Sequence, residues 1–240
     1  MLYVNLFLQE PTNWSVRMKD IYILQINTAF SRASIGIAKN GVLLVESINP
    51  DQHDHAAFIQ PEIQNLCSKL GVTLNELDAV AVINGPGSYT GLRVGLSSAK
   101  GIYYALNIPL ICINTLTWMA EAHLDEESTL IVPMIDARRD EVFTAIFDQK
   151  GNITAAPVAL KLTENSFETE LNDNIVTFIG DGAVKWENTC KHPQAAFPPS
   201  TYNAHHLAKL AYASFTKKEF ADLTYSEPFY VKDFYSTQKQ

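Results

Sequence analysis

The stretch best suited to chemistry is a glycine-rich turn between an expected strand and an expected helix. It runs from residue 84 to residue 95 as Asn-Gly-Pro-Gly-Ser-Tyr-Thr-Gly-Leu-Arg-Val-Gly. An apolar run predicts a buried strand at 80–83, and apolar residues at helical spacing predict a helix from Leu92 onward. The first N–H groups of such a helix lack partners and lie at the positive end of its dipole. An anion such as phosphate could therefore bind at Gly87, Ser88, Thr90 and Arg93.

This turn differs from both common glycine-rich nucleotide motifs. No Gly-Lys-Ser/Thr follows its second glycine, and Thr90 stands where a dinucleotide-binding loop has glycine. Glycine and proline also form tight turns whose small residues only let a helix and a strand approach each other. On these residues alone, an anion site and a packing role are both open.

The same run resembles the signature of the TsaB (YeaZ) family of bacterial threonylcarbamoyladenosine biosynthesis proteins, which are relatives of TsaD. The resemblance covers roughly residues 20–235. It implies an α/β fold of the actin-like ATPase (ASKHA, ribonuclease H-like) type, in which two related subdomains have mixed sheets with flanking helices. We expect the N-terminal subdomain at 18–116 and a shortened C-terminal subdomain at 117–240.

Two further segments resemble parts of this family or fold. Residues 132–143 are similar to the second family signature, and residues 178–183 to a loop that approaches the nucleotide in the actin-like fold. The resemblance implies that Asp136 and Asp181 line a nucleotide cleft. A salt-bridged hairpin is an equal alternative for the first segment, and aspartates after strands also cap turns.

The residues needed for catalysis are incomplete. Phosphoryl transfer requires carboxylates that hold hydrated Mg²⁺, yet Asn27 stands where the family usually has an acidic residue. Ser88 and Ser97 lack a histidine at the spacing of a nucleophile elbow or triad. We therefore expect no catalytic residue and no required cofactor, although the resemblance allows weak binding of ATP or ADP.

A histidine pair invites comparison with the metal-binding helix of TsaD. His53 and His55 are two residues apart, where helical side chains diverge, and Ile59 stands four residues after His55. A pair without a third ligand is a weak metal site. No metal is expected.

The helix after the glycine turn could also bind a partner. Small residues at 95, 98 and 101 would let another helix approach closely. The resemblance implies an interface that forms homodimers in isolation and a heterodimer with TsaD, for which the candidate residues are Tyr89, Leu92, Leu96, Ala99 and Tyr103. Packing of the same residues in the chain's own core is an equal alternative.

Composition limits the other classes of function. The net charge of −8 disfavours autonomous binding of nucleic acid. No apolar segment approaches the roughly 20 residues that cross a membrane. Three scattered cysteines indicate a reducing, cytoplasmic compartment. Residues 1–17 lack the basic start of a signal peptide, and we expect an extension that is disordered or a misassigned start.

The resemblance implies a pseudoenzyme. Its expected role is to support TsaD, together with the ATPase TsaE, in the transfer of a threonylcarbamoyl group to tRNA, with the tRNA bound only through the complex. The alternatives are an independent ATP-dependent kinase or ATPase and, from an older glycoprotease label of the family, a peptidase.

Overall fold

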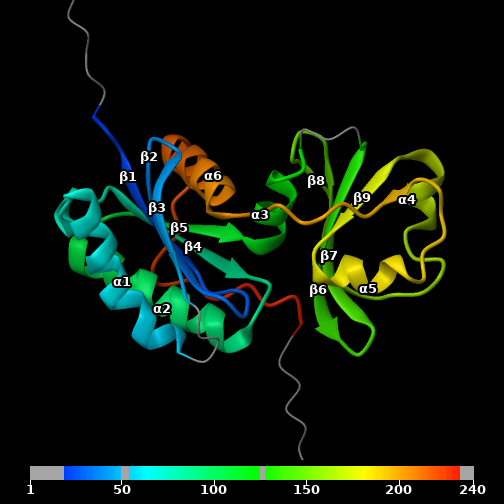
Figure 1. The fold of residues 1–240 in the computed structure, drawn as a ribbon, viewed down its shortest axis with the longest axis horizontal. Helices are drawn as coiled ribbons and strands as arrows, with labels where there is room; N and C mark the ends of the chain where they lie inside the picture. Colours follow the sequence, from blue (N-terminus) through cyan, green and yellow to red (C-terminus); the bar gives the residue numbers. More distant parts are fainter. Residues whose placement is uncertain (1–18, 50–53, 125–127, 233–240) are drawn as a thin grey trace, which may run out of the picture.

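The computed structural model describes residues 19–49, 54–124 and 128–232, and the predicted extension at 1–17 lies outside these ranges. The chain forms two lobes, each built on a five-stranded sheet (Figure 1). The strands of the first lobe are β1 (Tyr22–Asn27), β2 (Ser34–Lys39), β3 (Val42–Ile48), β4 (Ala79–Gly85) and β5 (Leu110–Asn114). Those of the second lobe are β6 (Leu130–Arg138), β7 (Glu141–Asp148), β8 (Ile153–Lys161), β9 (Val176–Ile179) and β10 (Ala195–Ala196).

The two sheets have the same strand order. The first is ordered β3-β2-β1-β4-β5, and the second, read from its other edge, is β8-β7-β6-β9-β10. In each sheet the first three strands are antiparallel and the last two join in parallel. The predicted pair of related α/β subdomains with mixed sheets is confirmed.

Helices cover the first sheet on both faces. One face carries α1 (His55–Leu70) and α2 (Tyr89–Leu106), and the other carries α6 (Ala204–Lys217) (Figure 1). In the second lobe α4 (Glu168–Asp173) and α5 (Asp181–Glu187) cover one face, and α3 (Thr115–Glu121) lies between the lobes. A short 3₁₀ helix spans Leu74–Glu76, with the predicted capping box of Thr73 and Glu76.

Local sequence explains where several elements turn or end. Asn40 and Gly41 both have positive φ, 51° and 81°, which suits the two-residue hairpin between β2 and β3. Asn107, with φ of 52°, ends α2 in the left-handed conformation. Every residue of β4 except Asn84 is buried, as its uncharged apolar run predicts.

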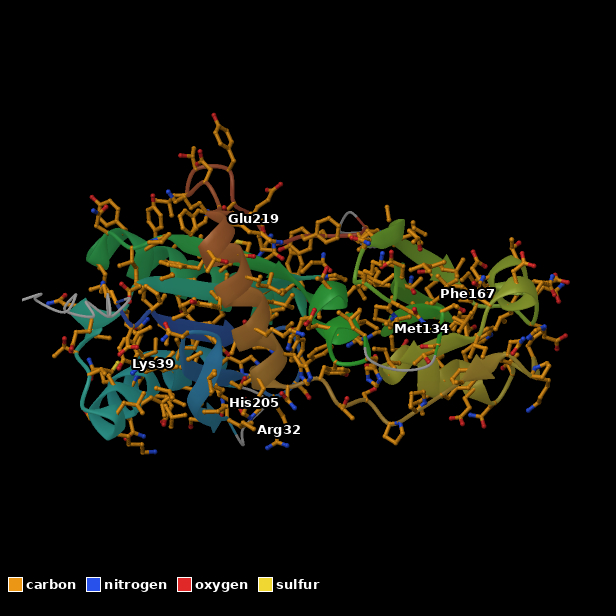
Figure 2. The ribbon with its side chains drawn as sticks, turned by 90° about the horizontal axis from the view of Figure 1, so that it is seen from above. Arg32, Lys39, Met134, Phe167, His205 and Glu219 are labelled. Carbon is orange, nitrogen blue, oxygen red and sulfur yellow. The ribbon has the colours of Figure 1, made fainter. Side chains whose placement is uncertain are left out.

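The predicted subdomain boundary is wrong for the C-terminal part of the chain. Residues 117–240 do not form one unit, because α6 returns to the first lobe and lies across its sheet (Figure 2). Its residues Leu207 and Ala211 pack in one core cluster with Ile23 and Ile111. Ala221 N then donates to the Leu110 carbonyl at 2.8 Å. The second lobe is therefore an insertion within the first.

The apolar core is continuous between the lobes. Trp118 and Met119 of α3 belong to the same cluster as Ile111 of the first sheet and Ile131 of the second. None of the helices within residues 19–49, 54–124 and 128–232 is long and apolar enough to cross a membrane.

Replacement of Leu207 by Ala should destabilise the protein by about 2–5 kcal/mol, because it removes a side chain that is 2% exposed beneath α6. Urea unfolding measures the change. His205→Ala, on the exposed side of the same helix, should alter stability by less than about 0.5 kcal/mol (Figure 2). Equal effects of the two changes would contradict the position given to α6.

Candidate functional site

At the start of α2, backbone N–H groups that could bind an anion already donate hydrogen bonds to acceptors within the chain. The Ser88 side chain accepts from Gly91 N at 3.3 Å, and Ser88 N donates to the Ala29 carbonyl at 2.7 Å. Ser88 and Thr90 are exposed, but two of the N–H groups expected to bind an anion thus have internal partners. Gly87 lies against Ala29, where a Cβ would come within 2.5 Å of the carbonyl oxygen.

The turn between β1 and β2 packs in close contact with the first turns of α2. Thr28 is fully buried, and its hydroxyl donates to the Gly91 carbonyl at 2.7 Å. A Cβ at Gly91 would overlap the Thr28 carbonyl oxygen, and one at Gly95 would overlap the Thr28 hydroxyl. The glycines of the motif are therefore needed for close packing of the chain on itself, which favours the packing interpretation.

The C-terminal segment covers the other side of the glycine turn. Phe229 N donates to the Asn84 carbonyl at 2.7 Å, and a Cβ at Gly85 would overlap the Phe229 carbonyl oxygen. Arg93 donates through Nε to the Tyr230 hydroxyl at 3.1 Å and lies 4.0 Å from the centre of the Tyr89 ring. Arg93 is therefore held by two tyrosines.

Asp136 and Asp181 of the second lobe do lie together. Asp136 N donates to Asp181 Oδ1 at 2.9 Å, while Asp136 Oδ1 accepts from Arg138 N at 2.8 Å and from Lys185 Nζ at 3.3 Å. Lys185 also lies 3.9 Å from Asp140. These contacts fit the salt-bridged alternative for the β6–β7 hairpin.

Aromatic side chains from three separate segments of the chain pack together beside the β1–β2 turn. Phe30, in the β1–β2 turn, has its ring centre 6.1 Å from those of Trp118 and Tyr202. Burial and the nearby Asp181 carboxylate raise the pKa of Tyr202. In the part of the chain that the structure describes, no hydrogen bond or ion pair joins the glycine turn to Asp136 or Asp181.

The site does not fit a magnesium–nucleotide complex. Asn27 is 7% exposed, and its Oδ1 accepts from Ala29 N at 3.1 Å, so the amide closes the turn. Among the described residues, no group of three or more His, Cys, Asp or Glu could hold a metal ion. His53 lies outside these residues, and Asp54, not His55, caps α1 by accepting from Ala57 N.

The prediction of a partner interface is wrong for three of its residues, because their side chains are buried within the chain. Leu92, Leu96 and Ala99 are 0%, 3% and 0% exposed and pack in the core of the chain. Tyr89 and Tyr103 are half-buried. Helical spacing identified one face of α2 correctly, but that face packs on the chain's own sheet.

The opposite face of α2 is open to solvent. Tyr104 is 81% exposed, and Ser97, Gly101 and Ala105 are also exposed. Beside them is a groove of about 180 Å³ between α1, α2 and the 3₁₀ helix, lined by Gln60, Ile63, Gln64, Leu74, Gly101, Ile102, Ala105 and Leu106. We call the exposed side of α1 and α2 with this groove the α1–α2 face.

Comparison with known proteins identifies the family. A family model described as "TsaD: tRNA N6-adenosine threonylcarbamoyltransferase" matches residues 45–238. A Haemophilus influenzae protein named "tRNA threonylcarbamoyladenosine biosynthesis protein TsaB" is 27% identical over 230 residues, which cover 90% of this chain and 95% of that one. The chain belongs to the TsaD-related TsaB (YeaZ) family.

Two other TsaB-family proteins extend this comparison. The Bacillus subtilis protein named TsaB is 30% identical over 133 residues, which span 55% of this chain and 57% of that one. The solved structure "YeaZ from Pseudomonas aeruginosa" has a TM-score of 0.73 at 24% identity and covers 88% of this chain and 99% of that one. This structural likeness shows that the TsaB-family fold is shared.

Replacement of Gly91 by Ala should destabilise the protein by about 1–3 kcal/mol, because the new methyl group would overlap the Thr28 carbonyl. Gly101→Ala, in the same helix, meets nothing within 4 Å and should stabilise it by up to about 1 kcal/mol. Urea unfolding of both variants measures the difference. Equal changes in the free energy of unfolding would show that the β1–β2 turn does not pack closely against α2.

Proposed function

We propose that this chain is a non-catalytic scaffold and activator of TsaD in the biosynthesis of threonylcarbamoyladenosine in tRNA. The observation that supports this proposal is the closure of the expected nucleotide site by the chain's own groups. Thr28 and Ala29 cover the start of α2, and Phe30 stacks on Tyr202, which lies near Asp181. In this proposal TsaD carries out the chemistry, TsaE acts with it, and tRNA binds only through the complex.

The α1–α2 face is the proposed contact with TsaD. Exposed Tyr104 offers an aromatic side chain, of a kind enriched at interfaces. A methyl group added at Gly101 would meet no described atom within 4 Å, so a partner helix could approach the backbone closely. The isolated protein would use the same face to form a homodimer.

An independent ATPase or kinase is the second candidate. The one observation in its favour is that Asp136 and Asp181, the two aspartates that the resemblance places at a nucleotide cleft, are neighbours in the structure, with Asp136 N donating to Asp181 Oδ1. The peptidase alternative has less support, since the Ser88 hydroxyl caps α2 and bonds to no histidine among the described residues. Weak binding of ATP or ADP remains compatible with the scaffold role.

Gly101→Arg should weaken binding to the cognate TsaD at least about tenfold, because a long charged side chain would stand in the groove. Titration calorimetry gives the affinity. Reconstitution of tRNA modification with TsaD, TsaE and the enzyme that forms the carbamoyl adenylate should then require this protein and should be impaired by the same change.

Val184→Glu is the matched control, since Val184 is 65% exposed on α5 of the other lobe. It should leave both affinity and modification unchanged. If modification proceeds equally well when this protein is omitted, the scaffold role is excluded.

The isolated protein should release no phosphate from ATP above the level of an Asp136→Ala variant, since Asp136 is engaged by Lys185 and Arg138. A steady-state phosphate-release assay measures this. Robust turnover that the Asp136→Ala change abolishes would establish the ATPase alternative in place of the scaffold.

A further inference from the structure

A second hollow lies beside the α1–α2 face. Its volume is about 210 Å³, and it is lined by Arg93, Leu96, Ser97, Lys100, Ser226, Glu227 and Pro228. Arg93, Ser97 and Lys100 come from one side of α2, because residues three and four apart are neighbours on a helix. Ser226 to Pro228 belong to the C-terminal segment that packs on the glycine turn.

Two cations of this hollow lack an anionic partner. Lys100 is half-buried, and no ion pair reaches it from the residues that the structure describes. Arg93 uses Nε on the Tyr230 hydroxyl, and its other N–H groups have no acceptor among the same residues.

The lining of the hollow includes two cations and one acidic residue, Glu227, so its other polar groups offset the positive charge only in part. Glu227 is exposed and forms no ion pair with Arg93 or Lys100 in the described chain. The Ser226 hydroxyl donates to the Asp222 carbonyl. Burial raises the pKa of Cys112 to about 11 despite the nearby Lys100, so its thiol is uncharged at neutral pH.

The charge of α2 contrasts with that of the whole chain. The protein carries 26 acidic residues and a net charge of −8, yet the 18 residues of α2 include Arg93 and Lys100 and no acidic residue. Arg93, Ser97, Gly101 and Ala105 follow one another at intervals of four along its exposed side. The cationic hollow and the apolar groove therefore lie at opposite ends of one row.

We propose that the hollow between Arg93 and Lys100 receives an acidic side chain of TsaD when that protein docks on the α1–α2 face. The inference rests on the proposed function. An acidic occupant is chosen because α2 carries two cations and no acidic residue. A carboxylate there would pair with two cations, while small and apolar groups of the partner would fill the groove near Gly101. The pair of contacts would fix the direction in which the partner segment lies along α2.

Charge reversal at Lys100 tests the inference. Lys100→Glu should weaken TsaD binding at least about tenfold in calorimetry, and Lys100→Gln should weaken it less. Raising the salt concentration should reduce the affinity of the unmodified protein more than that of Lys100→Gln. Lys191→Glu, an equal charge change on the exposed second lobe, should have little effect. Thermal unfolding of each variant confirms that it is folded.

The outcomes separate the two proposals. Loss of binding in Gly101→Arg with none in Lys100→Glu would overturn the carboxylate site and leave the docking face intact. Full TsaD binding by both variants would overturn both. Loss of only the homodimer in Lys100→Glu would assign the hollow to a second copy of this chain and overturn the inference. An Asp→Lys or Glu→Lys change in TsaD that restores binding of Lys100→Glu alone would identify the carboxylate.

Discussion

The contact between Thr28 and the first turns of α2 constrains the rest of the first lobe. The Thr28 carbonyl and hydroxyl lie where side chains of Gly91 and Gly95 would otherwise stand. This contact brings the β1–β2 turn over the helix start, and Ala29 then accepts the hydrogen bond of Ser88 N. Since the same backbone groups cannot also surround a phosphate, the packing that holds β1 against α2 is what sets this site apart from a nucleotide-binding turn.

The strands and the related subdomains were predictable because each depends on local patterns. Uncharged apolar runs identified β1 and β4, and Asn40-Gly41 identified the hairpin between β2 and β3. Asp136 lies near the end of β6 and Asp181 follows β9, the parallel neighbour of β6, so the two aspartates meet at one edge of the sheet. The residues that favour a turn and the apolar pattern of a strand are local in the sequence, so both can be inferred without knowledge of distant contacts.

The errors arose where the answer depends on distant partners. The spacing of Leu92, Leu96 and Ala99 shows that α2 has an apolar face, but not whether a sheet or another protein covers it. In the same way, the apolar side of α6 does not reveal which sheet it covers. The exposed face of α2 could have been found by asking which side of the helix carries Arg93, Ser97 and Gly101 instead of the apolar residues.

The insertion of the second lobe within the first has a consequence for synthesis of the protein. All five strands of the first sheet have been made once Asn114 is added, but the helix that covers one of its faces ends at Lys217. At a synthesis rate of about 5–20 residues per second, α6 is completed roughly 5–20 s after the last strand of this sheet, and until then one face of the sheet lacks its covering helix. During this interval Ile23 and Ile111, later buried near α6, are open to chaperones and to premature association.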